Sequence, residues 1–208
     1  MKEKNISKNQ LHRLPFYLSY LKNKCKEGIE CISSPQIALG LGLSEEQVRK
    51  DLALVSRSCG KPRTGRKVAN LISDIEYYLG YGDSRKAILV GAGHLGSALF
   101  AYQGFEKYGL DIVAAFDTNS EKIGTTIRNK HIYSLDRLEE ECQCIDVSIG
   151  IITVPVEVAQ DVCDRLVKIG IKAIWNFAPI KLDTPANVIV QNENMASSLA
   201  VLSSKLNK

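Results

Sequence analysis

The sequence predicts an α/β protein with an N-terminal winged-helix (helix-turn-helix) domain and a C-terminal Rossmann-like domain built on a parallel sheet. Three observations predict this fold. The first part contains two short helical patterns around a glycine turn, the second alternates strand and helix patterns, and a GxGxxG motif joins its first strand to a helix. The expected domains are 1–80 and 86–192, with a linker over 81–85 and a terminal helix within 193–208.

The composition excludes several classes of protein. The 208 residues are 45% hydrophobic and 24% charged, which supplies a core and argues against disorder. No run of about 18 apolar residues exists to span a membrane, and the charged start lacks the apolar stretch of a secretion signal. The six cysteines contain no CxxC pair. We therefore expect no metal site, reduced thiols and a cytoplasmic protein.

Positive charge is concentrated in the first part of the chain. Residues 1–84 contain 14 Lys and Arg against 9 Asp and Glu, whereas the remainder contains 13 against 14. Between Leu52 and Val68 there are five basic residues and no acidic one. This asymmetry indicates a polyanionic partner such as DNA, although a solvated basic loop explains the charge alone equally well.

Two helical patterns frame the first domain, over residues 10–27 and 68–80. In the first of them Pro15 falls in the opening turn, where its missing N–H costs least. Apolar residues at helical spacing predict its buried face. That face consists of Leu14, Tyr17, Leu18, Leu21 and Cys25.

A helix-turn-helix pattern lies between these two helices. Residues 33–40 begin with Ser33 as a cap and end at a glycine turn, and Ser44 opens the next helix in a capping-box pattern with Gln47. A short helix, a glycine turn and a second helix with a basic face are typical of DNA-binding domains. The basic, Gly- and Pro-containing segment 58–67 fits the β-hairpin wing that often follows.

The alternation in the second part predicts parallel strands joined by right-handed crossovers. The expected strands are 87–90, 111–116, 147–154, 173–177 and 188–191. The expected helices are 96–108, 134–142 and 157–169. Residues 194–207 follow the completed sheet as a short amphipathic helix, which needs a partner surface such as a second subunit.

The most specific chemical signal is the glycine motif, which follows a strand and opens a helix. Gly91 allows the tight turn, Gly93 lets a pyrophosphate approach the backbone, and Gly96 lets helix and strand pack closely. The start of the helix offers free N–H groups to phosphate. An acid at the end of the next strand accepts hydrogen bonds from ribose hydroxyls, which favours NAD over NADP. The predicted NAD(H)-binding residues are Gly91, Ala92, Gly93, His94, Leu95, Gly96 and Asp117.

Two later turns lie where a nicotinamide ring would reach, because ligands of open α/β sheets bind beyond the carboxyl ends of strands. Thr153, Val154 and Pro155 follow one strand, and Phe177 follows the next. Ordinary loop packing explains their spacing equally well. No substrate domain and no acid–base pair follow, so we expect no enzyme. A nucleotide site fused to a DNA-binding module indicates a sensor.

Further motifs are RLP at 13–15, ISS at 32–34, QVRKDL at 47–52, GAGHLG at 91–96, VAAFD at 113–117 and NFAP at 176–179. Together these motifs resemble the Rex family of redox-sensing transcriptional repressors, and the resemblance covers nearly the whole chain. It implies a homodimer that binds palindromic operator DNA when free or with NAD+, and that releases the DNA when NADH closes the dimer. It also implies that the C-terminal helix is swapped between subunits.

The resemblance places Gln47, Arg49 and Lys50 on the recognition helix, where the two cations would reach guanine edges or phosphates. Basic residues of the wing are expected on phosphates or in the minor groove. The predicted DNA-binding residues are Ser33, Ser44, Gln47, Arg49, Lys50, Arg57, Lys61, Arg63, Arg66 and Lys67.

The chain departs from the family pattern in two places. Residues 53–68 lose polar and aromatic groups typical of the family and gain positive charge, which predicts a divergent operator. Many members have Asp where this chain has Asn194, and that Asp pairs with the residues matching Arg13 and Tyr102. Tyr102 is also expected to border the NAD(H) site. Asn194 keeps a hydrogen bond and loses the charge, so we expect a blunted NADH response or an altered ligand preference.

Other functions remain open from the sequence. The chain fits a divergent paralog with an altered operator, or an adenine-nucleotide sensor that ignores redox state. A small NAD-dependent oxidoreductase is opposed by the missing acid–base pair, and a CoA-binding module would share this type of sheet. Thiol-based sensing at Cys59 is a weaker alternative, since most such thiols are inert.

Overall fold

The computed structural model describes residues 6–57, 65–143 and 145–206. The chain divides into two compact units, Met1–Asp83 and Ser84–Lys208. Arg85 begins the first strand of the second unit.

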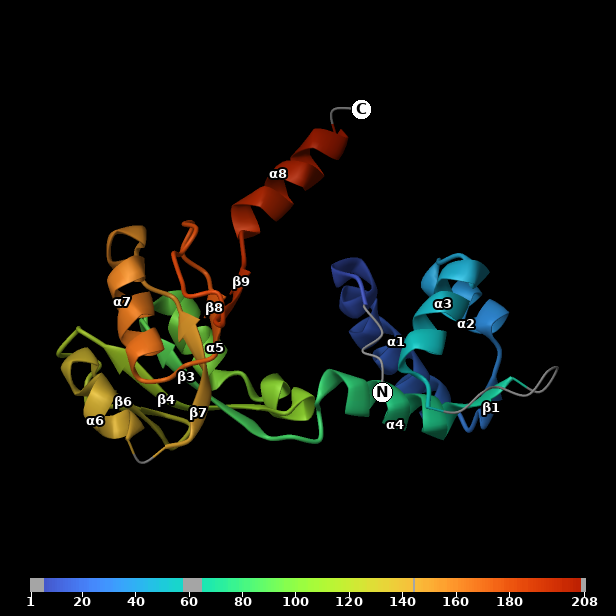
Figure 1. The fold of residues 1–208 in the computed structure, drawn as a ribbon, viewed down its shortest axis with the longest axis horizontal. Coiled ribbons are helices and arrows are strands. Elements are labelled where there is room, and N and C mark those ends of the chain that lie inside the picture. The colour runs from blue at the N-terminus through green and yellow to red at the C-terminus, as the bar shows by residue number, and fades with distance from the viewer. Residues whose placement is uncertain (1–5, 58–64, 144, 207–208) are drawn as a thin grey trace. The chain divides into compact units, whose positions relative to one another are not determined.

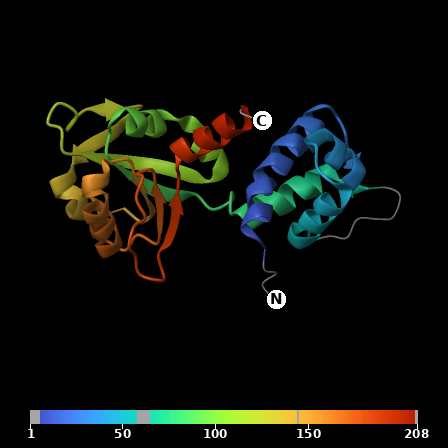
Figure 2. The same ribbon diagram turned by 90° about the horizontal axis from the view of Figure 1, so that it is seen from above.

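The N-terminal unit is a helical bundle with a two-stranded sheet, and Figure 2 shows its helices gathered together (blue to blue-green). Strands β1 and β2 pair antiparallel, with Cys31 opposite Lys67. The predicted wing is therefore described only at its end, and Lys61 and Arg63 lie outside the described residues. The elements are α1 (Lys8–Lys26), β1 (Cys31–Ile32), α2 (Ser34–Leu41), α3 (Glu45–Val55), β2 (Arg66–Lys67) and α4 (Val68–Leu79).

Helix α1 begins earlier than the sequence pattern predicts. Ser7 and Gln10 form a capping box, in which each side chain accepts the other residue's backbone N–H. Pro15 consequently lies inside the helix, and the prediction that it occupies the opening turn is wrong. Burial of the apolar face stabilises the helix despite the hydrogen bond that Pro15 removes. Leu14, Tyr17, Leu18 and Leu21 are all buried, whereas Cys25 is exposed.

Caps and a left-handed glycine set the helix-turn-helix. Ser33 and Gln36 form a capping box at α2, and Gly42 ends α2 at φ +64°, a conformation that glycine adopts without strain. At α3 the structure shows one half of the predicted capping box, in which the Ser44 hydroxyl accepts the N–H of Gln47 at 3.2 Å.

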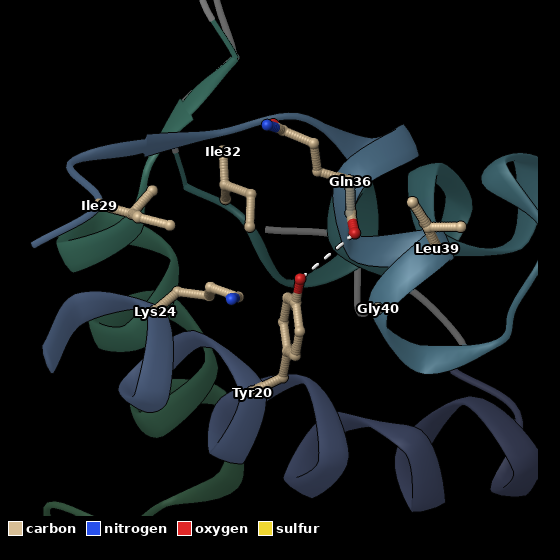
Figure 3. Close-up of a pocket in the computed structure, with 7 residues that line it drawn as sticks. All are labelled: Tyr20, Lys24, Ile29, Ile32, Gln36, Leu39 and Gly40. Carbon is tan, nitrogen blue, oxygen red and sulfur yellow. Dashed lines mark hydrogen bonds between the residues drawn. The ribbon is translucent and has the colours of Figure 1, made fainter. Parts of the chain in front are cut away.

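Helix α1 packs against α2 at a glycine. A Cβ at Gly40 would lie 2.4 Å from the Tyr20 hydroxyl oxygen, so a larger residue here would have to displace the Tyr20 ring. The Tyr20 hydroxyl donates to the carbonyl of Gln36 at 3.3 Å (Figure 3). The ring borders a mostly apolar pocket of about 250 Å³. None of the predicted site residues lines this pocket, but the lining residue Gln36 accepts a hydrogen bond from the hydroxyl of Ser33, a predicted DNA-binding residue.

The C-terminal unit is built on a seven-stranded sheet (Figure 1). Its strands are β3 (Arg85–Val90), β4 (Leu110–Asp117), β5 (Thr126–Ile127), β6 (Lys130–Ser134), β7 (Val147–Ile152), β8 (Ala173–Asn176) and β9 (Ile189–Asn192). Its helices are α5 (His94–Ala101), α6 (Leu138–Cys142), α7 (Val156–Lys168) and α8 (Met195–Leu206), with 3₁₀ turns η1 (Gln103–Tyr108) and η2 (Leu135–Arg137).

The spatial order of the strands is β5-β6-β4-β3-β7-β8-β9, and every neighbouring pair except β5 and β6 is parallel. Numbered along the chain, the parallel strands run 3-2-1-4-5-6, the Rossmann order. The predicted fold class is confirmed. The direction of winding reverses between β3 and β7, and this is the point where such sheets bind ligands.

Alternate residues of the central strands serve two apolar layers. Ile88 and Val90 of β3 pack in one cluster with side chains of α6 and α7. Ala87 and Leu89 pack on the other face, in a cluster that includes Phe100 of α5. The sheet is therefore covered on both faces, which explains why its strands read as continuous apolar runs.

Two segments differ from the sequence prediction. The predicted helix 96–108 breaks at Tyr102, whose backbone is extended, and continues as the 3₁₀ turn η1. The hairpin of β5 and β6 was not predicted, and β6 includes Ser134, where a helix was expected. Its two-residue turn places Arg128 and Asn129 at φ +50° and +63°, a conformation usually signalled by Asn-Gly.

Helix α8 follows the sheet as predicted, with its leucines exposed. Leu199, Leu202 and Leu206 are 68%, 61% and 86% exposed. Within the described ranges, no helix combines the length and the hydropathy that membrane crossing requires.

Candidate functional site

The glycine turn after β3 needs glycine at two positions for different reasons. Gly91 has φ +98°, and a Cβ there would lie 2.8 Å from the carbonyl oxygen of Thr153. A Cβ at Gly96 would lie 1.9 Å from the carbonyl oxygen of Gly91. A Cβ at Gly93, by contrast, meets no described atom within 4 Å. Gly91 and Gly96 thus serve packing, while Gly93 faces open space that a ligand can occupy.

The start of α5 is available to an anion. Gly93 is the N-cap residue of α5 and, among the described residues, no side chain caps the helix. The first N–H groups of a helix are unpaired and carry a positive partial charge. His94 is exposed and Leu95 half-buried in this first turn. The geometry suits a phosphate beside Gly93.

Thr153 couples the end of β7 to the glycine turn. Its hydroxyl lies 2.7 Å from the carbonyl oxygen of Gly91 and 3.1 Å from that of Val90, and it donates to them. Its backbone N–H also donates to Val90. The sequence predicted Thr153 as part of a pocket wall, and the structure shows that it is bonded to the glycine turn after β3. Val154 and Pro155 continue this turn into α7.

Four aromatic rings form a row beside the second predicted turn. Neighbouring ring centroids are 4.9 Å apart for Tyr102 and Phe105, 5.6 Å for Phe105 and Trp175, and 4.7 Å for Trp175 and Phe177. The backbone N–H of Phe177 donates to the carbonyl of Ile152, the last residue of β7, at 2.9 Å. The Phe177 turn and the Thr153 turn are therefore neighbours at one edge of the sheet, as predicted.

Asn176 holds the Phe177 turn, a role that the sequence did not reveal. Its side chain is fully buried. The amide nitrogen donates to the carbonyl of Ile180 and to Asn192 Oδ1, both at 2.9 Å, and Oδ1 accepts the N–H of Ala178 at 3.0 Å. A buried amide satisfied in this way fixes the loop that carries the ring.

The acidic end of the site contains a lysine that sequence reasoning missed. Asp117 ends β4, and its Oδ1 accepts the N–H of Asn119 at 2.8 Å. The ammonium of Lys122 lies 3.9 Å from Asp117 Oδ2 and donates to the carbonyl of Ala92 at 2.8 Å. A loop lysine five residues after the acid belongs to no general motif, so only the fold reveals that it reaches the glycine turn.

On the candidate DNA surface, the basic side chains of α3 are paired within the helix. Arg49 lies 2.8 Å from Glu45 and Lys50 lies 2.7 Å from Glu46. The hydrogen bond from Lys50 lowers the pKa of Glu46. All four side chains are about half exposed or more, and exposed pairs of this kind are weak. The two cations are therefore accessible and can exchange their partners for phosphates.

Arg57 and Arg66, both predicted to bind DNA, hold the end of α3. Arg57 Nε donates to Asp74 Oδ1 at 2.9 Å, and its guanidinium carbon lies 4.6 Å from the centre of the Tyr77 ring. Arg66 donates to the hydroxyl of Ser56 at 2.5 Å. The buried carboxylate of Asp74 was not anticipated.

The structure also gives the positions of three other residues that were predicted to bind DNA. The hydroxyls of Ser33 and Ser44 cap α2 and α3, while Lys67 is exposed in β2.

Arg13 has a partner inside its own unit. Its Nε lies 2.7 Å from Asp51 Oδ2 and its second terminal nitrogen lies 3.0 Å from Oδ1. Tyr17 and Gln10 donate to the same carboxylate at 2.7 and 3.1 Å. Asn194, predicted to face Arg13 and Tyr102, accepts the N–H of Ser197 at 2.9 Å at the start of α8.

Comparison with known families divides the chain in the same way. Residues 5–53 match the family model "Putative DNA-binding protein N-terminus". Residues 83–180 match the model "CoA binding domain".

Similar proteins extend over nearly the whole chain. A redox-sensing transcriptional repressor Rex from Treponema denticola is 43% identical over 99% of this chain and 98% of its own. One from Carboxydothermus hydrogenoformans is 43% identical over 97% of each. The crystal structure of RSP with NAD+ and operator DNA matches with a TM-score of 0.93 at 35% identity, covering 98% of this chain and 94% of RSP. RSP with NADH matches at 0.86, again at 35% identity, covering 97% and 94%. The chain therefore belongs to the Rex family of redox-sensing transcriptional repressors.

Proposed function

We propose that this protein is a DNA-binding transcriptional repressor that senses the balance of NADH and NAD+ and releases its operator when NADH binds. The observation that carries the proposal is that two modules share one chain. One is the uncapped N-terminus of α5, which can bind a phosphate where the strand order of a Rossmann sheet reverses. The other is a helix-turn-helix unit. Relatives of the same length support it, since RSP has been crystallised with NAD+ and operator DNA and with NADH.

In this proposal NAD(H) lies across the carboxyl edge of the sheet. The pyrophosphate is bound at Gly93 by the N–H groups of the first turn of α5, and Asp117 accepts hydrogen bonds from the adenosine ribose. The nicotinamide reaches the neighbouring turns of Thr153 and Phe177, with Tyr102 at the end of the aromatic row. The cofactor supplies the redox signal through its own oxidation state. The protein's residues bind and orient it, and no acid–base pair among the predicted site residues points to an enzyme.

The proposed DNA-binding surface is α3 with the segment that follows it. Gln47, Arg49 and Lys50 reach bases and phosphates from the helix, and Lys67 contributes phosphate contacts from β2. A homodimer, with α8 exchanged between subunits, presents two such helices to a palindromic operator. The exposed leucines of α8 support such an exchange. A repressor of this kind would work in the cytoplasm of a bacterial cell.

The release of DNA requires two dimer arrangements that differ in affinity for NADH. A shift from 1:99 to 99:1 needs a difference of about 5.5 kcal/mol in NADH binding between them. Arg13, Tyr102 and Asn194 are the proposed contacts of the switch. Asp51 of α3 already binds the Arg13 guanidinium. If Arg13 changed its partner, α3 would therefore lose a contact that holds it in position.

The test is DNA binding measured by fluorescence anisotropy, with a Rex-type palindrome and a random duplex at one fixed salt concentration. Each titration is run without ligand, with NAD+ and with NADH. The proposal expects specific binding that NADH abolishes and NAD+ preserves. Specific binding that is indifferent to NADH contradicts the sensing role. If the palindrome is bound no more tightly than random DNA, it is not the operator of this protein. Selection of binding sites from a random pool then identifies the operator.

The match to the CoA-binding model supports a second candidate ligand. CoA and NAD share an adenosine diphosphate moiety, which the start of α5 would accept from either. Asp117 favours NAD, because CoA carries a 3′-phosphate on the ribose that an adjacent carboxylate repels. Competition of CoA against bound NADH distinguishes the two ligands, and displacement at equal concentrations would favour CoA.

A further inference from the structure

The loop after β4 is built to hold one lysine in a fixed position. Asp117 and Asn119 each accept a backbone N–H two residues ahead, at 2.8 and 2.9 Å. The N–H of Lys122 donates to the Asn119 carbonyl at 3.0 Å, and the Lys122 carbonyl accepts both the N–H and the hydroxyl of Thr125. The backbone on both sides of Lys122 is therefore tied down.

The side chain of Lys122 spans from this loop to the glycine turn after β3, where we propose that the pyrophosphate binds. Its ammonium donates to the carbonyl of Ala92 at 2.8 Å, and that carbonyl also accepts the Ser97 hydroxyl at 2.8 Å. The separation of 3.9 Å from Asp117 Oδ2 is an ion pair too long for a hydrogen bond. An ammonium has three N–H donors. At least one donor is thus left for a ligand beside Asp117.

The charges at this end of the site balance one another. Asp117 is the carboxylate expected to accept the 2′-hydroxyl of the adenosine ribose, and a 2′-phosphate in the same place would be repelled. Lys122 contributes the opposite charge within 4 Å of that carboxylate. NADP-binding proteins of this fold use a nearby cation to accommodate the 2′-phosphate. Lys122 is therefore a cation of this kind, and the neighbouring Asp117 carboxylate prevents it from accommodating a 2′-phosphate.

We propose that Lys122 is a dinucleotide-binding and specificity-determining residue: it donates to the adenosine end of NAD(H), and together with Asp117 it sets the preference between NADH and NADPH. This inference rests on the proposed NAD(H) site. Loss of the Asp117 charge turns the balanced pair into a site for the 2′-phosphate, and loss of Lys122 as well removes that site again.

The test compares the full-length wild type with Lys122→Met, Asp117→Asn and the double variant. Affinities for NADH and NADPH are measured by quenching of Trp175, the only tryptophan of the chain, whose ring borders Phe177. Lys172→Met is the matched control, because this exposed lysine precedes β8 at the opposite edge of the sheet. Ala92 keeps its bond from Ser97 in every variant, so we expect unchanged melting temperatures.

Lys122→Met is expected to weaken NADH binding about tenfold, as for one hydrogen bond from a charged group. Asp117→Asn is expected to shift the ratio of NADPH to NADH affinity toward NADPH by about tenfold, and the double variant should lack this shift. Raising the salt concentration from about 0.05 M to about 0.5 M should reduce the gain, since the attraction is partly exposed. A loss of shape alone would not change a ratio in this salt-dependent way.

Two results overturn the role of Lys122 while leaving the NAD(H) site standing. One is NADH affinity that Lys122→Met leaves unchanged. The other is a double variant that prefers NADPH as strongly as Asp117→Asn. A wild type that binds neither dinucleotide overturns the NAD(H) site and the role of Lys122 together.

Discussion

Arg13 Nε lies 2.7 Å from Asp51 Oδ2, and this ion pair joins helix α1 to helix α3. The Asp51 side chain is 1% exposed. Its carboxylate accepts hydrogen bonds from Gln10, Arg13 and Tyr17, which lie on one face of α1. One buried carboxylate thus fixes α3 against α1, so the stability of the unit and the position of the helix that we propose reads DNA depend on the same contact.

Asp51→Asn should destabilise the N-terminal unit by about 3 kcal/mol, because it leaves the partly buried Arg13 cation without its partner. Urea unfolding followed by helical circular dichroism measures the loss. Operator affinity should fall as well, since α3 is less firmly held. Glu27→Gln serves as the control, because it removes only an exposed pair with Lys24 and should cost less than about 1 kcal/mol. Equal losses in the two variants would contradict the importance of the buried pair.

The same carboxylate predicts how stability depends on pH. Burial acts to raise the pKa of Asp51, but the hydrogen bonds from Arg13, Tyr17 and Gln10 outweigh it, so the pKa lies below its ordinary value of 3.8. A lowered pKa in the folded state means that the contribution is complete above 3.8 and is lost as the pH falls through the lower, folded-state value. The difference in unfolding free energy between wild type and Asp51→Asn should be constant near neutral pH and shrink below pH 3.8. A difference that stays constant down to pH 2.5, about one unit below that value, would contradict the shift.

Gly93 and Gly96, which belong to the glycine motif after β3, should respond differently to substitution. Gly93→Ala should leave the melting temperature near that of the wild type, since the added Cβ meets no described atom within 4 Å. It should nevertheless weaken NADH binding by a factor of ten or more, because the methyl group would occupy the space proposed for the pyrophosphate. Gly96→Ala should lower the melting temperature itself, since its Cβ would collide with the Gly91 carbonyl. Calorimetric titration and thermal unfolding of both variants check this, and equal loss of stability in both would be the contrary result.

Local patterns predicted the elements whose residues act on their sequence neighbours. Caps at Ser33 and Ser44, the alternation of strands and helices, and the GxGxxG motif with Asp117 are of this kind. Most of the groups that were missed act across long stretches of chain. Asp51 is satisfied by residues 34 to 41 positions away, Lys122 reaches a carbonyl 30 positions away, and Asp74 binds Arg57 17 positions away. From the sequence alone, a charged residue in a helix is predicted to be exposed to solvent. Only the fold shows that a distant partner allows it to be buried. The β5–β6 turn was missed because Arg-Asn is an uncommon pair for two positive φ angles.

The glutamates of α3 should limit DNA binding. Glu46→Gln frees Lys50 from its 2.7 Å ion pair and removes a carboxylate that repels phosphate. We expect affinity for operator and random duplex to rise by about twofold to fivefold at low salt, the scale of one exposed pair. Lys50→Gln should weaken both and reduce the slope of log affinity against log salt by about one.

The control for this experiment is Glu106→Gln. It changes the net charge by the same amount as Glu46→Gln but lies in the C-terminal unit. Anisotropy titrations at several salt concentrations compare the variants. An equal gain from Glu106→Gln would attribute the effect to net charge, and the local pairing with Lys50 would then be irrelevant.

Asn194 allows the charge of the proposed switch to be tested apart from the helix that it begins. Its Oδ1 accepts the N–H of Ser197, and Asp is as good a helix cap as Asn. Asn194→Asp should therefore preserve α8 while adding a charge that can attract Arg13 across the dimer. Asn194→Ala should lose the cap, at a cost of about 1 kcal/mol to the helix.

If the missing charge blunts the NADH response, Asn194→Asp should change the NADH concentration that half-releases the operator by about fivefold or more, a coupling of about 1 kcal/mol. Binding of NADH in the absence of DNA should change by less, because the added carboxylate attracts Arg13 and is not among the groups proposed to hold the dinucleotide. The anisotropy assay with NADH titrated into the preformed complex measures the first quantity, and Trp175 quenching measures the second. An unchanged release midpoint would mean that Asn194 only caps α8, and that Asp51 is the partner that matters to Arg13 in this protein.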